Sequence, residues 1–312
     1  MTELSKAGVL IEFNDSIRIF RTDLLTSKSC GNKQFKLTSN LQQLKQSGVG
    51  RVLTFGGLWS NHLHAFAIAC EDQGLEAVAV VRGEPTQDSL LLNNAIKHGL
   101  KVSYVSRSDY RKRHDEDYVD ELLHKLDCDA HLPEGGSNAI AVTACAEISS
   151  LVIACCGRPP AILALAVGTG ATMAGVVNGA LAGQKVIGVP VVQDRQVKSC
   201  ISEWVCPHSK AEWMLSQPAD PPRYGKVDQA LLEFVLQTYH DTGVILDPVY
   251  NAKALRSLLK FRGFDHAGED CVFIHTGGLG GCLGFADELM RVDGPIAAQL
   301  LGEVKQILGF AD

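Results

Sequence analysis

The stretch that decides the fold is Ala161-Ile-Leu-Ala-Leu-Ala-Val-Gly-Thr-Gly-Ala-Thr172. Its first seven residues are apolar, which is typical of a strand buried on both faces of a parallel sheet. Glycines let a backbone approach an anion, and the free amides and the dipole at a helix N-terminus favour a phosphate. We therefore predict a buried strand, then a phosphate-binding turn, then a helix. The turn consists of Gly168, Thr169, Gly170, Ala171 and Thr172.

Two other interpretations of this turn stay open at this point. It could be a tight strand-to-helix turn without a ligand. It could also bind a dinucleotide, because Gly168-x-Gly170 resembles the start of the G-x-G-x-x-G pattern. Met173 stands where the third glycine of that pattern belongs, and no acidic residue precedes Asp194 near the end of the next strand.

Strands and helices alternate along most of the chain. Apolar runs predict strands at Arg51–Phe55, Glu76–Val81, Lys101–Val105, Ala161–Val167, Lys185–Val191 and Cys271–His275. Amphipathic segments predict helices at Lys36–Ser47, Asn61–Gln73, Gln87–Lys97, Tyr118–Leu126, Ile140–Cys155 and Thr172–Leu181. This order indicates an α/β fold with buried, mostly parallel sheets. Residues 207–224 contain four prolines, so we expect an excursion or a lid there.

Composition narrows the functional class. The 312 residues carry a net charge of -6, which argues against a nucleic-acid partner. We find no apolar stretch of the ~18 residues that a membrane span needs. The N-terminus lacks the pattern of a signal peptide, and the ten cysteines form no C-x-x-C pair. We therefore expect a cytoplasmic protein with reduced thiols, no metal site and no membrane partner.

Lys33 follows a turn of small residues, Ser29-Cys30-Gly31-Asn32, and precedes a predicted helix. An isolated lysine is usually an exposed surface residue. An amine at the start of a helix could instead be partly desolvated, as Schiff-base chemistry requires. Lys33 is therefore the candidate nucleophile of the chain.

Seven short elements carry a resemblance to a known family. They are Gly31-Asn32-Lys33-x-x-Lys36-Leu37, Thr54-Phe55-Gly56-Gly57-x-x-Ser60-Asn61-His62, Pro133-Glu134-Gly135-Gly136-Ser137-Asn138, Gly168-Thr169-Gly170-Ala171-Thr172, Tyr224-Gly225, Asp247-Pro248-Val249-Tyr250 and His275-Thr276-Gly277-Gly278. Their order resembles that of the D-cysteine desulfhydrase / 1-aminocyclopropane-1-carboxylate deaminase family, over about residues 20–290. Each element alone is weak, and the shared order is specific.

The resemblance implies a fold-type-II pyridoxal-phosphate enzyme, similar to the tryptophan synthase β chain, with two open, twisted, mostly parallel sheets and flanking helices. With it we expect residues 1–40 and 150–312 to form a large cofactor-binding domain and residues 41–149 a smaller domain. Family members are commonly dimers, so a homodimer is expected.

The resemblance also implies a role for each site residue. Lys33 would hold pyridoxal 5'-phosphate as a Schiff base and move the proton at the substrate α-carbon. The Gly168–Thr172 turn would hold the 5'-phosphate, and Asn61 would contact the phenolic oxygen. Ser60, with the amides around Asn61 and His62, would receive the substrate carboxylate. Tyr224 and Tyr250 would line the substrate face. Thr276 would lie near the pyridine nitrogen, where a hydroxyl leaves the ring less readily protonated than a carboxylate would.

Several of these residues have a structural alternative. Ser60 and Asn61 could be an ordinary helix N-cap, and Tyr224 and Tyr250 could be packing residues. Trp59 could line a pocket or fill the core. His62 and His275 show no carboxylate partner at a defined spacing in the sequence, so neither is assigned as an acid or a base.

Two positions separate the activities within the family. The ring-opening deaminases resemble one another in having Glu after the tyrosine of Asp-Pro-Val-Tyr, where this chain has Asn251, and Leu in the His-x-Gly-Gly element, where it has Thr276. Thr276 resembles the desulfhydrases, whereas Asn251 fits neither group, since desulfhydrases usually have Thr there. Thr22 is a further departure, because Arg-Asp-Asp is usual at that point.

These features favour β-elimination from a small amino acid, as in conversion of D-cysteine to pyruvate, sulfide and ammonia. The D configuration rests entirely on the resemblance. 1-Aminocyclopropane-1-carboxylate deamination is the alternative within the family. A nicotinamide-dependent oxidoreductase would use the Gly168 turn but leave Asn32-Lys33 and Ser60-Asn61 unexplained. A pyridoxal-phosphate-binding protein with little catalysis is the third possibility.

Overall fold

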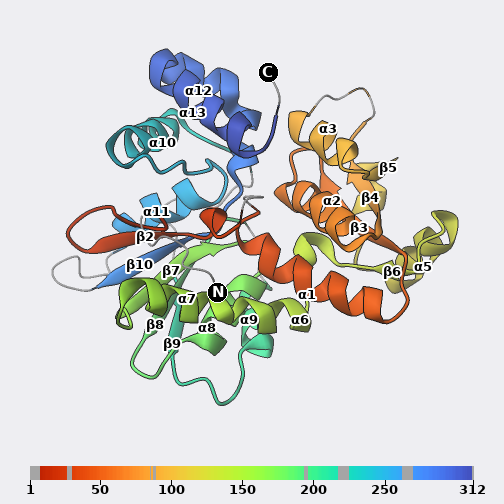
Figure 1. The fold of residues 1–312 in the computed structure, drawn as a ribbon, viewed down its shortest axis with the longest axis horizontal. Helices are drawn as coiled ribbons and strands as arrows, with labels where there is room; N and C mark the ends of the chain where they lie inside the picture. Colours follow the sequence, from red (N-terminus) through yellow and green to blue (C-terminus); the bar gives the residue numbers. More distant parts are fainter. Residues whose placement is uncertain are drawn as a thin grey trace. The chain divides into compact units, whose positions relative to one another are not determined.

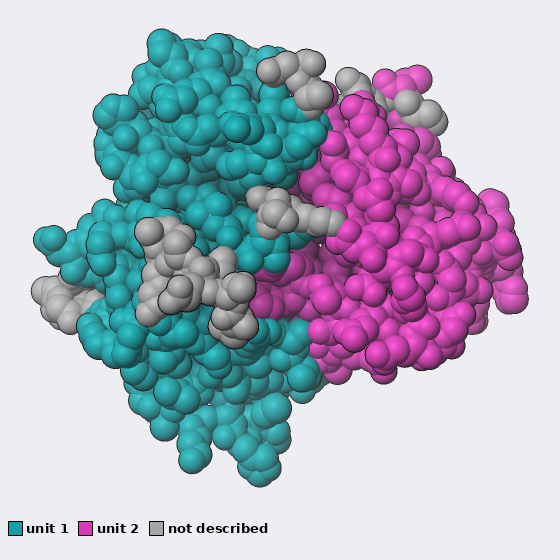
Figure 2. Space-filling model, viewed as in Figure 1, with its two compact units in different colours: residues 1–32, 142–312 teal, residues 33–141 magenta. Residues whose placement is uncertain are grey.

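A computed structural model describes residues 8–26, 30–84, 86, 89–192, 196–216, 225–261 and 270–310 of the chain. Ser29 and Tyr224 lie outside these described residues. The chain divides into two compact units, coloured separately in Figure 2. Unit 1 contains residues 1–32 and 142–312, and unit 2 contains residues 33–141. The assignment of a cofactor-binding domain and a smaller domain stays a prediction.

Unit 1 contains a six-stranded sheet in the order β1-β2-β10-β7-β8-β9 (Figure 1). Its strands are β1 (Leu10–Glu12), β2 (Ile17–Arg21), β7 (Ile162–Val167), β8 (Lys185–Pro190), β9 (Glu212–Leu215) and β10 (Cys271–His275). The β1–β2 pair is antiparallel, and the other neighbouring pairs are parallel. Its helices are η1 (Thr22–Leu24), α7 (Glu147–Cys156), α8 (Ala171–Gly179), α9 (Val197–Trp204), α10 (Gln229–Thr242), α11 (Asn251–Leu259), η3 (Leu279–Phe285), α12 (Ala286–Val292) and α13 (Gly294–Ile307).

The core of unit 1 explains why β7 is apolar throughout. Every residue of this central strand is buried. Because strand side chains alternate between the two faces of a sheet, Ile162, Ala164 and Ala166 share one face. They belong to a cluster that also contains apolar side chains of α10, α11 and α13. A parallel sheet buried in this way selects a continuous apolar run.

Unit 2 contains a four-stranded parallel sheet in the order β5-β4-β3-β6. Its strands are β3 (Arg51–Gly57), β4 (Glu76–Arg82), β5 (Lys101–Val105) and β6 (Ala130–His131). Its helices are α2 (Asn61–Gln73), α3 (Leu90–Lys97), α4 (Arg107–Tyr110), α5 (Glu116–Lys125) and η2 (Glu134–Gly136). Helices α1 (Asn32–Gln46) and α6 (Ala139–Cys145) each include a boundary between the units.

Local signals explain the ends of α2 in unit 2. The Ser60 hydroxyl caps its start by accepting a hydrogen bond from the Leu63 amide, and Gly74 ends it in a left-handed conformation.

On one face of the sheet, Phe55 of β3 packs edge-on against Tyr110 of α4. Val119 and Leu122 of α5 complete this cluster.

The α/β fold with two mostly parallel sheets is confirmed, and all six predicted strands are present. The sequence analysis missed β1, β2, β6 and β9. Strand β2 contains Arg18 and Arg21, whose charges interrupt the apolar pattern on which strand prediction depends. The prediction of an excursion over residues 207–224 is wrong for β9, which pairs with β8 as an edge strand.

The expectation that no apolar stretch reaches membrane-spanning length is also wrong. Residues 139–156 have the length and mean hydropathy, 2.0, of a possible span. They form α6 and α7, with a turn at Ala146 between them. On α7, Ile148 and Val152 are buried, and the Ser149 hydroxyl donates to the Val176 carbonyl. Core helices of soluble proteins pass the same test of length and composition, so this stretch is weak evidence for a membrane.

Candidate active site

The glycine loop, Gly168–Thr172, joins β7 to α8 in unit 1. Gly170 caps α8 with a φ of 91°, a conformation that L side chains rarely adopt. A Cβ at Gly170 would lie 2.7 Å from Ile201 Cγ1. Gly170 has no side chain with which to cap the first turn of α8. The amides of that turn therefore remain suited to an anion.

Thr172 adds a directed hydroxyl to the loop. Its side chain is buried, and Thr172 Oγ1 accepts a 2.8 Å hydrogen bond from Asn32 Nδ2. A hydroxyl that accepts one hydrogen bond keeps its own hydrogen for another partner. A phosphate oxygen, which only accepts, would suit that hydrogen. The glycine cradle, the helix amides and this hydroxyl together fit a phosphate group.

The chain before Lys33 is held tightly within unit 1. Gly31 has a φ of 55°, and a Cβ there would lie 2.3 Å from the Thr276 carbonyl oxygen. A Cβ at Gly277 would lie 2.7 Å from Gly31 Cα, so each glycine requires the other to be small. The Asn32 amide donates to the Thr276 carbonyl at 3.1 Å. Asn32 therefore contacts both Thr172 and Thr276, and Lys33 follows it directly in the chain.

Lys33 itself is the second residue of α1, which begins four residues earlier than predicted. The lysine is half-buried, so its position differs from that of the exposed surface lysines that make up most of this residue type. In unit 2, the charges of Lys33 and Lys36 contribute to the low pKa of His62, after burial, which is the largest cause.

The Ser60-Asn61-His62 element begins α2 in unit 2. Ser60 Oγ accepts from the Leu63 amide at 3.3 Å, so the N-cap alternative holds for this residue. An N-cap of this kind leaves the first helical amides available to an anion such as a carboxylate. Asn61 is partly exposed at this end of the helix.

His62, in contrast, points into unit 2. Its imidazole is buried, and Nε2 lies 2.9 Å from Thr54 Oγ1. Because Thr54 Oγ1 donates to the Leu132 carbonyl, His62 Nε2 must carry the hydrogen of this contact. His62 is therefore a neutral residue of the interior, and its backbone amide remains the candidate for substrate binding. Trp59, two residues before Asn61, is exposed and does not fill the core.

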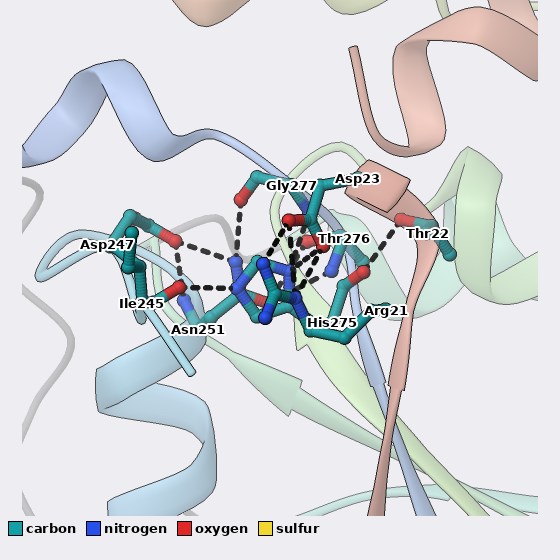
Figure 3. A network of polar contacts seen from close by, with 9 residues as sticks. All are labelled: Arg21, Thr22, Asp23, Ile245, Asp247, Asn251, His275, Thr276 and Gly277. Carbon is teal, nitrogen blue, oxygen red and sulfur yellow. Dashed lines mark hydrogen bonds and ion pairs between the residues drawn. The ribbon is translucent and has the colours of Figure 1, made fainter. Parts of the chain in front are cut away.

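Asn251 is fully occupied by hydrogen bonds. Figure 3 shows it between Asp247 on one side and the start of the His275–Gly278 turn on the other. Its Nδ2 donates to Asp247 Oδ2 at 2.6 Å and to the Gly277 carbonyl at 2.7 Å. Its Oδ1 accepts from the Thr276 amide at 3.0 Å and from Thr276 Oγ1 at 3.2 Å. Asn251 has no solvent exposure, so its side chain positions Thr276 and Gly277.

Tyr250 lies against the glycine loop. A Cβ at Gly168 would lie 3.4 Å from Tyr250 Cε1, so the ring and this glycine are in close approach. The Tyr250 amide donates to Asp247 Oδ1 at 2.6 Å, which holds its backbone. Tyr250 is thus beside a predicted phosphate ligand, in unit 1. Tyr224, its predicted counterpart, lies outside the described residues.

The sequence analysis missed a buried polar cluster that includes His275, the residue before Thr276. Arg21 Nη2 lies 2.6 Å from Asp23 Oδ2, and His275 Nδ1 lies 3.1 Å from Asp23 Oδ1 (Figure 3). The Thr22 hydroxyl donates to the His275 carbonyl at 2.6 Å. Although burial raises the pKa of Asp23, the charges of His275 and Arg21 hold it below its usual range. His275 therefore has a carboxylate partner, which its distance in the chain concealed.

Comparison with known proteins identifies the family. A model of the pyridoxal-phosphate dependent enzyme family matches residues 16–277. The chain belongs to this family. A putative 1-aminocyclopropane-1-carboxylate deaminase of Pyrococcus horikoshii is 25% identical over 301 residues, with 90% of each chain covered. A bifunctional D-cysteine desulfhydrase/1-aminocyclopropane-1-carboxylate deaminase of Arabidopsis thaliana is 28% identical over 305 residues, covering 88% of this chain and 75% of that protein.

A solved structure described as an ACC deaminase homologue has a TM-score of 0.73 at 25% identity, with 88% of each chain covered. The resemblance found in the sequence is therefore confirmed, and so are the fold-type-II architecture and the pyridoxal-phosphate cofactor of this family. The glycine loop belongs to a pyridoxal-phosphate enzyme, which removes the nicotinamide alternative.

Proposed function

We propose that Lys33 is the covalent attachment point of pyridoxal 5'-phosphate and that the glycine loop holds its phosphate. The bond between Asn32 and Thr172 carries this proposal, because it joins the residue before Lys33 to the predicted phosphate ligands. We assign the phenolic oxygen of the cofactor to Asn61 and its ring nitrogen to Thr276.

We further propose that Ser60 and the amides of Asn61 and His62 bind the substrate carboxylate. The start of α2 supports this role, because the Ser60 hydroxyl caps the Leu63 amide rather than the amides of Asn61 and His62. Tyr250, which lies against Gly168, would line the substrate face, together with Tyr224. Ser60 accepts from Leu63 and so keeps its hydrogen for donation to a carboxylate oxygen or a leaving group.

The reaction that we propose is β-elimination from a small amino acid, with D-cysteine as the substrate. The D-cysteine desulfhydrase name of the Arabidopsis relative supports it, as does Thr276. Deamination of 1-aminocyclopropane-1-carboxylate is the second candidate, supported by the names of both relatives. The structure disfavours it at one point, since the fully bonded Asn251 amide brings no carboxylate of its own to the ring.

When bound, the cofactor supplies an electron-withdrawing ring that stabilises negative charge on the substrate α-carbon. The residues of the chain do the rest. Lys33 Nζ takes the α-proton, and the Ser60 end of α2 holds the carboxylate in position. The Thr172 hydroxyl and the amides of α8 hold the phosphate. Thiolate then leaves the β-carbon, and one water completes the conversion to pyruvate and ammonia.

Reduction with borohydride tests the attachment. Wild-type protein loaded with pyridoxal phosphate should gain the mass of the reduced cofactor on the peptide that contains Lys33. Lys33→Ala should lose both this mass and the visible absorption of the cofactor. Lys45→Ala, on the same helix at an exposed position, is the matched control and should retain both. A label that persists in Lys33→Ala would overturn the assignment.

A keto-acid assay tests the reaction. D-cysteine should yield pyruvate and sulfide, and L-cysteine, β-chloro-D-alanine, D-serine and the cyclopropane amino acid define the specificity. Formation of 2-oxobutyrate from the cyclopropane substrate alone would favour the second candidate. Cofactor loading without keto acid from any of these substrates would indicate a binding protein with little catalysis.

We also propose that the chain acts as a homodimer in the cytoplasm, with a small amino acid as its partner molecule. The membership of the family supports the amino-acid substrate. Light scattering coupled to size-exclusion chromatography tests the dimer, since a monomeric mass at micromolar concentration would contradict it.

A further inference from the structure

The orientation of the Asn251 amide is determined by its neighbours. Its nitrogen faces the Asp247 carboxylate and the Gly277 carbonyl, both of which only accept hydrogen bonds. Its oxygen faces the Thr276 amide, which only donates. Exchange of the nitrogen and oxygen would leave all three contacts without a hydrogen bond. The amide therefore has one orientation in the folded protein.

This orientation determines the direction of the Thr276 hydroxyl. Asn251 Oδ1 cannot donate, so Thr276 Oγ1 must donate its hydrogen across the 3.2 Å contact between them. This contact is longer than a typical hydroxyl hydrogen bond. Its strength therefore depends on the negative charge of Asp247, to which the Asn251 amide nitrogen donates. As long as Thr276 Oγ1 donates to Asn251 Oδ1, it can only accept a hydrogen bond from a further partner.

The charge behind Asn251 is that of Asp247. Asp247 Oδ1 accepts from the Val249 and Tyr250 amides, and its Oδ2 accepts from both nitrogens of Asn251. These partners are all N–H donors, which suit an ionised carboxylate and give a carboxyl proton no acceptor. Burial raises the pKa of Asp247, and the hydrogen bonds from Asn251 and Tyr250 oppose that rise. The pKa of Asp247 is raised on balance, and we take its carboxyl as an anion at neutral pH because its four hydrogen-bond partners all donate.

Hydrogen bonds in a chain polarise one another, and the effect grows where water is excluded. Asp247 and Asn251 have no solvent exposure, and Thr276 is almost completely buried. The Asp247 anion draws the Asn251 N–H and makes Oδ1 of the same amide a stronger acceptor. That oxygen in turn draws the Thr276 hydrogen, which makes Thr276 Oγ1 more basic. The Asp247 charge thus increases the electron density on Thr276 Oγ1 through the two hydrogen bonds.

We propose that Asp247 and Asn251 are positioning residues that make Thr276 Oγ1 an acceptor for a protonated ring nitrogen of the cofactor. This proposal rests on the proposed placement of Thr276 beside that nitrogen. An isolated hydroxyl could donate to an unprotonated nitrogen, which is why the sequence predicted a ring less readily protonated. The hydrogen-bonded chain reverses that prediction. Asp247 then acts through two residues, where the ring-opening deaminases were expected to use the glutamate at position 251.

The test is the protonation state of the ring, measured by NMR on holoenzyme loaded with ¹⁵N-labelled pyridoxal 5'-phosphate at neutral pH. Wild type should show a protonated nitrogen. Thr276→Val keeps the shape and the backbone amide but removes the hydroxyl, so the nitrogen should become unprotonated. Thr276→Ser should restore the proton. Asn251→Ala should lose it although Thr276 remains, because the hydroxyl is then able to donate to the nitrogen.

A binding measurement gives a second readout that is independent of the NMR shift. A cofactor analogue with carbon in place of the ring nitrogen lacks the N–H donor. Wild type should bind the natural cofactor about ten- to a hundredfold more tightly than this analogue, as expected for a charge-assisted hydrogen bond. The ratio should fall close to one in Thr276→Val and should be retained in Thr276→Ser.

An unprotonated ring in wild type, or equal affinity for the two cofactors, would overturn the proposal. So would a protonated ring in Thr276→Val. A purely structural role for Asn251 would lower stability or cofactor occupancy in Asn251→Ala and leave the nitrogen shift of the bound fraction unchanged. Failure of the proposed function looks different, because no cofactor would then be attached at Lys33 in wild type.

Discussion

Asn32 Nδ2 donates a hydrogen bond of 2.8 Å to Thr172 Oγ1, which ties the residue before Lys33 to the end of the glycine loop. Thr172 accepts from an asparagine and keeps a hydrogen to donate. Thr276 donates to an asparagine and keeps lone pairs to accept. Two asparagines thus give the two threonine hydroxyls opposite hydrogen-bonding roles toward a further partner: Thr172 can donate and Thr276 can accept. These roles suit a phosphate oxygen on Thr172 and a protonated ring nitrogen on Thr276.

Replacement of Asn32 should weaken cofactor binding. Asn32→Ala frees Thr172 to turn its hydroxyl away from a phosphate and loosens the chain before Lys33. We expect about a tenfold loss of affinity for pyridoxal phosphate, as for one hydrogen bond, in equilibrium titrations. Asn40→Ala is the matched control, since Asn40 is another buried amide of α1, which donates to the Lys36 carbonyl and to Asn138 Oδ1. Equal losses in the two variants would contradict the role of Asn32.

Replacement of Gly31 should destabilise the protein through a steric overlap. In Gly31→Ala the new Cβ meets the Thr276 carbonyl and the backbone of Gly277, and the positive φ adds strain. We expect the free energy of unfolding to fall by about 2–4 kcal/mol, measured by urea denaturation. Gly48 also has a positive φ, but no atom of the described residues around it lies within 4 Å of a Cβ placed there. Gly48→Ala should therefore cost about 1 kcal/mol, and a similar cost for Gly31→Ala would refute the overlap.

A carboxylate at position 251 should be poorly tolerated. Asn251→Asp places a second buried carboxylate where an N–H now donates to Asp247 at 2.6 Å. We expect a loss of about 3–5 kcal/mol in unfolding free energy at pH 7. Like charges raise the pKa of such a pair, so the loss should shrink as the pH falls toward 5.

The control for this variant is Asn178→Asp. Asn178 donates to the Trp204 carbonyl and accepts from the Cys206 amide, and neither of these partners is a carboxylate. In Asn178→Asp the unfolding free energy should fall by only about 1–2 kcal/mol, and this decrease should not become smaller as the pH falls. If both aspartate variants lose the same stability with the same pH dependence, the Asp247–Asn251 contact is not the cause.

Unit 2 should lose stability in mild acid. Burial lowers the pKa of His131 to about 4, and burial also lowers the pKa values of His62 and His64. Such histidines bind protons better in the unfolded chain, so the free energy of unfolding falls as the pH drops from about 6.5 toward 4. The carboxylate Asp23, whose pKa is also lowered, loses its contribution only below about pH 4.

His131→Phe tests this dependence. His131 packs edge-on against Phe55, and His131 Nε2 has no hydrogen-bond partner within the described part of the chain. The phenylalanine should keep the packing against Phe55. It should reduce the fall in unfolding free energy between pH 7 and pH 4.5 by at most about 3 kcal/mol. Urea unfolding at pH 7, 5.5 and 4.5 measures this fall. His124→Asn, at an exposed position of α5 in the same unit, is the control variant.

The sequence determined the elements that depend on neighbouring residues. The apolar run at 161–167 and the glycines after it predicted β7, its turn and α8 because strand burial and turn conformation are encoded locally. Ser60 predicted the start of α2 for the same reason. The seven ordered elements identified the family and, with it, the cofactor.

Tertiary structure alone decided what the polar side chains do. Asp23 and His275 are 252 positions apart in the chain, and packing β2 beside β10 brings them to 3.1 Å. The sequence presented Asn251 as a missing charge, whereas the fold surrounds it with Asp247, Thr276 and Gly277. A hydrogen bond depends on the distance and direction between two groups, and only the packed chain sets both for residues that are remote in sequence. Whether a given threonine donates or accepts is therefore a property of the fold.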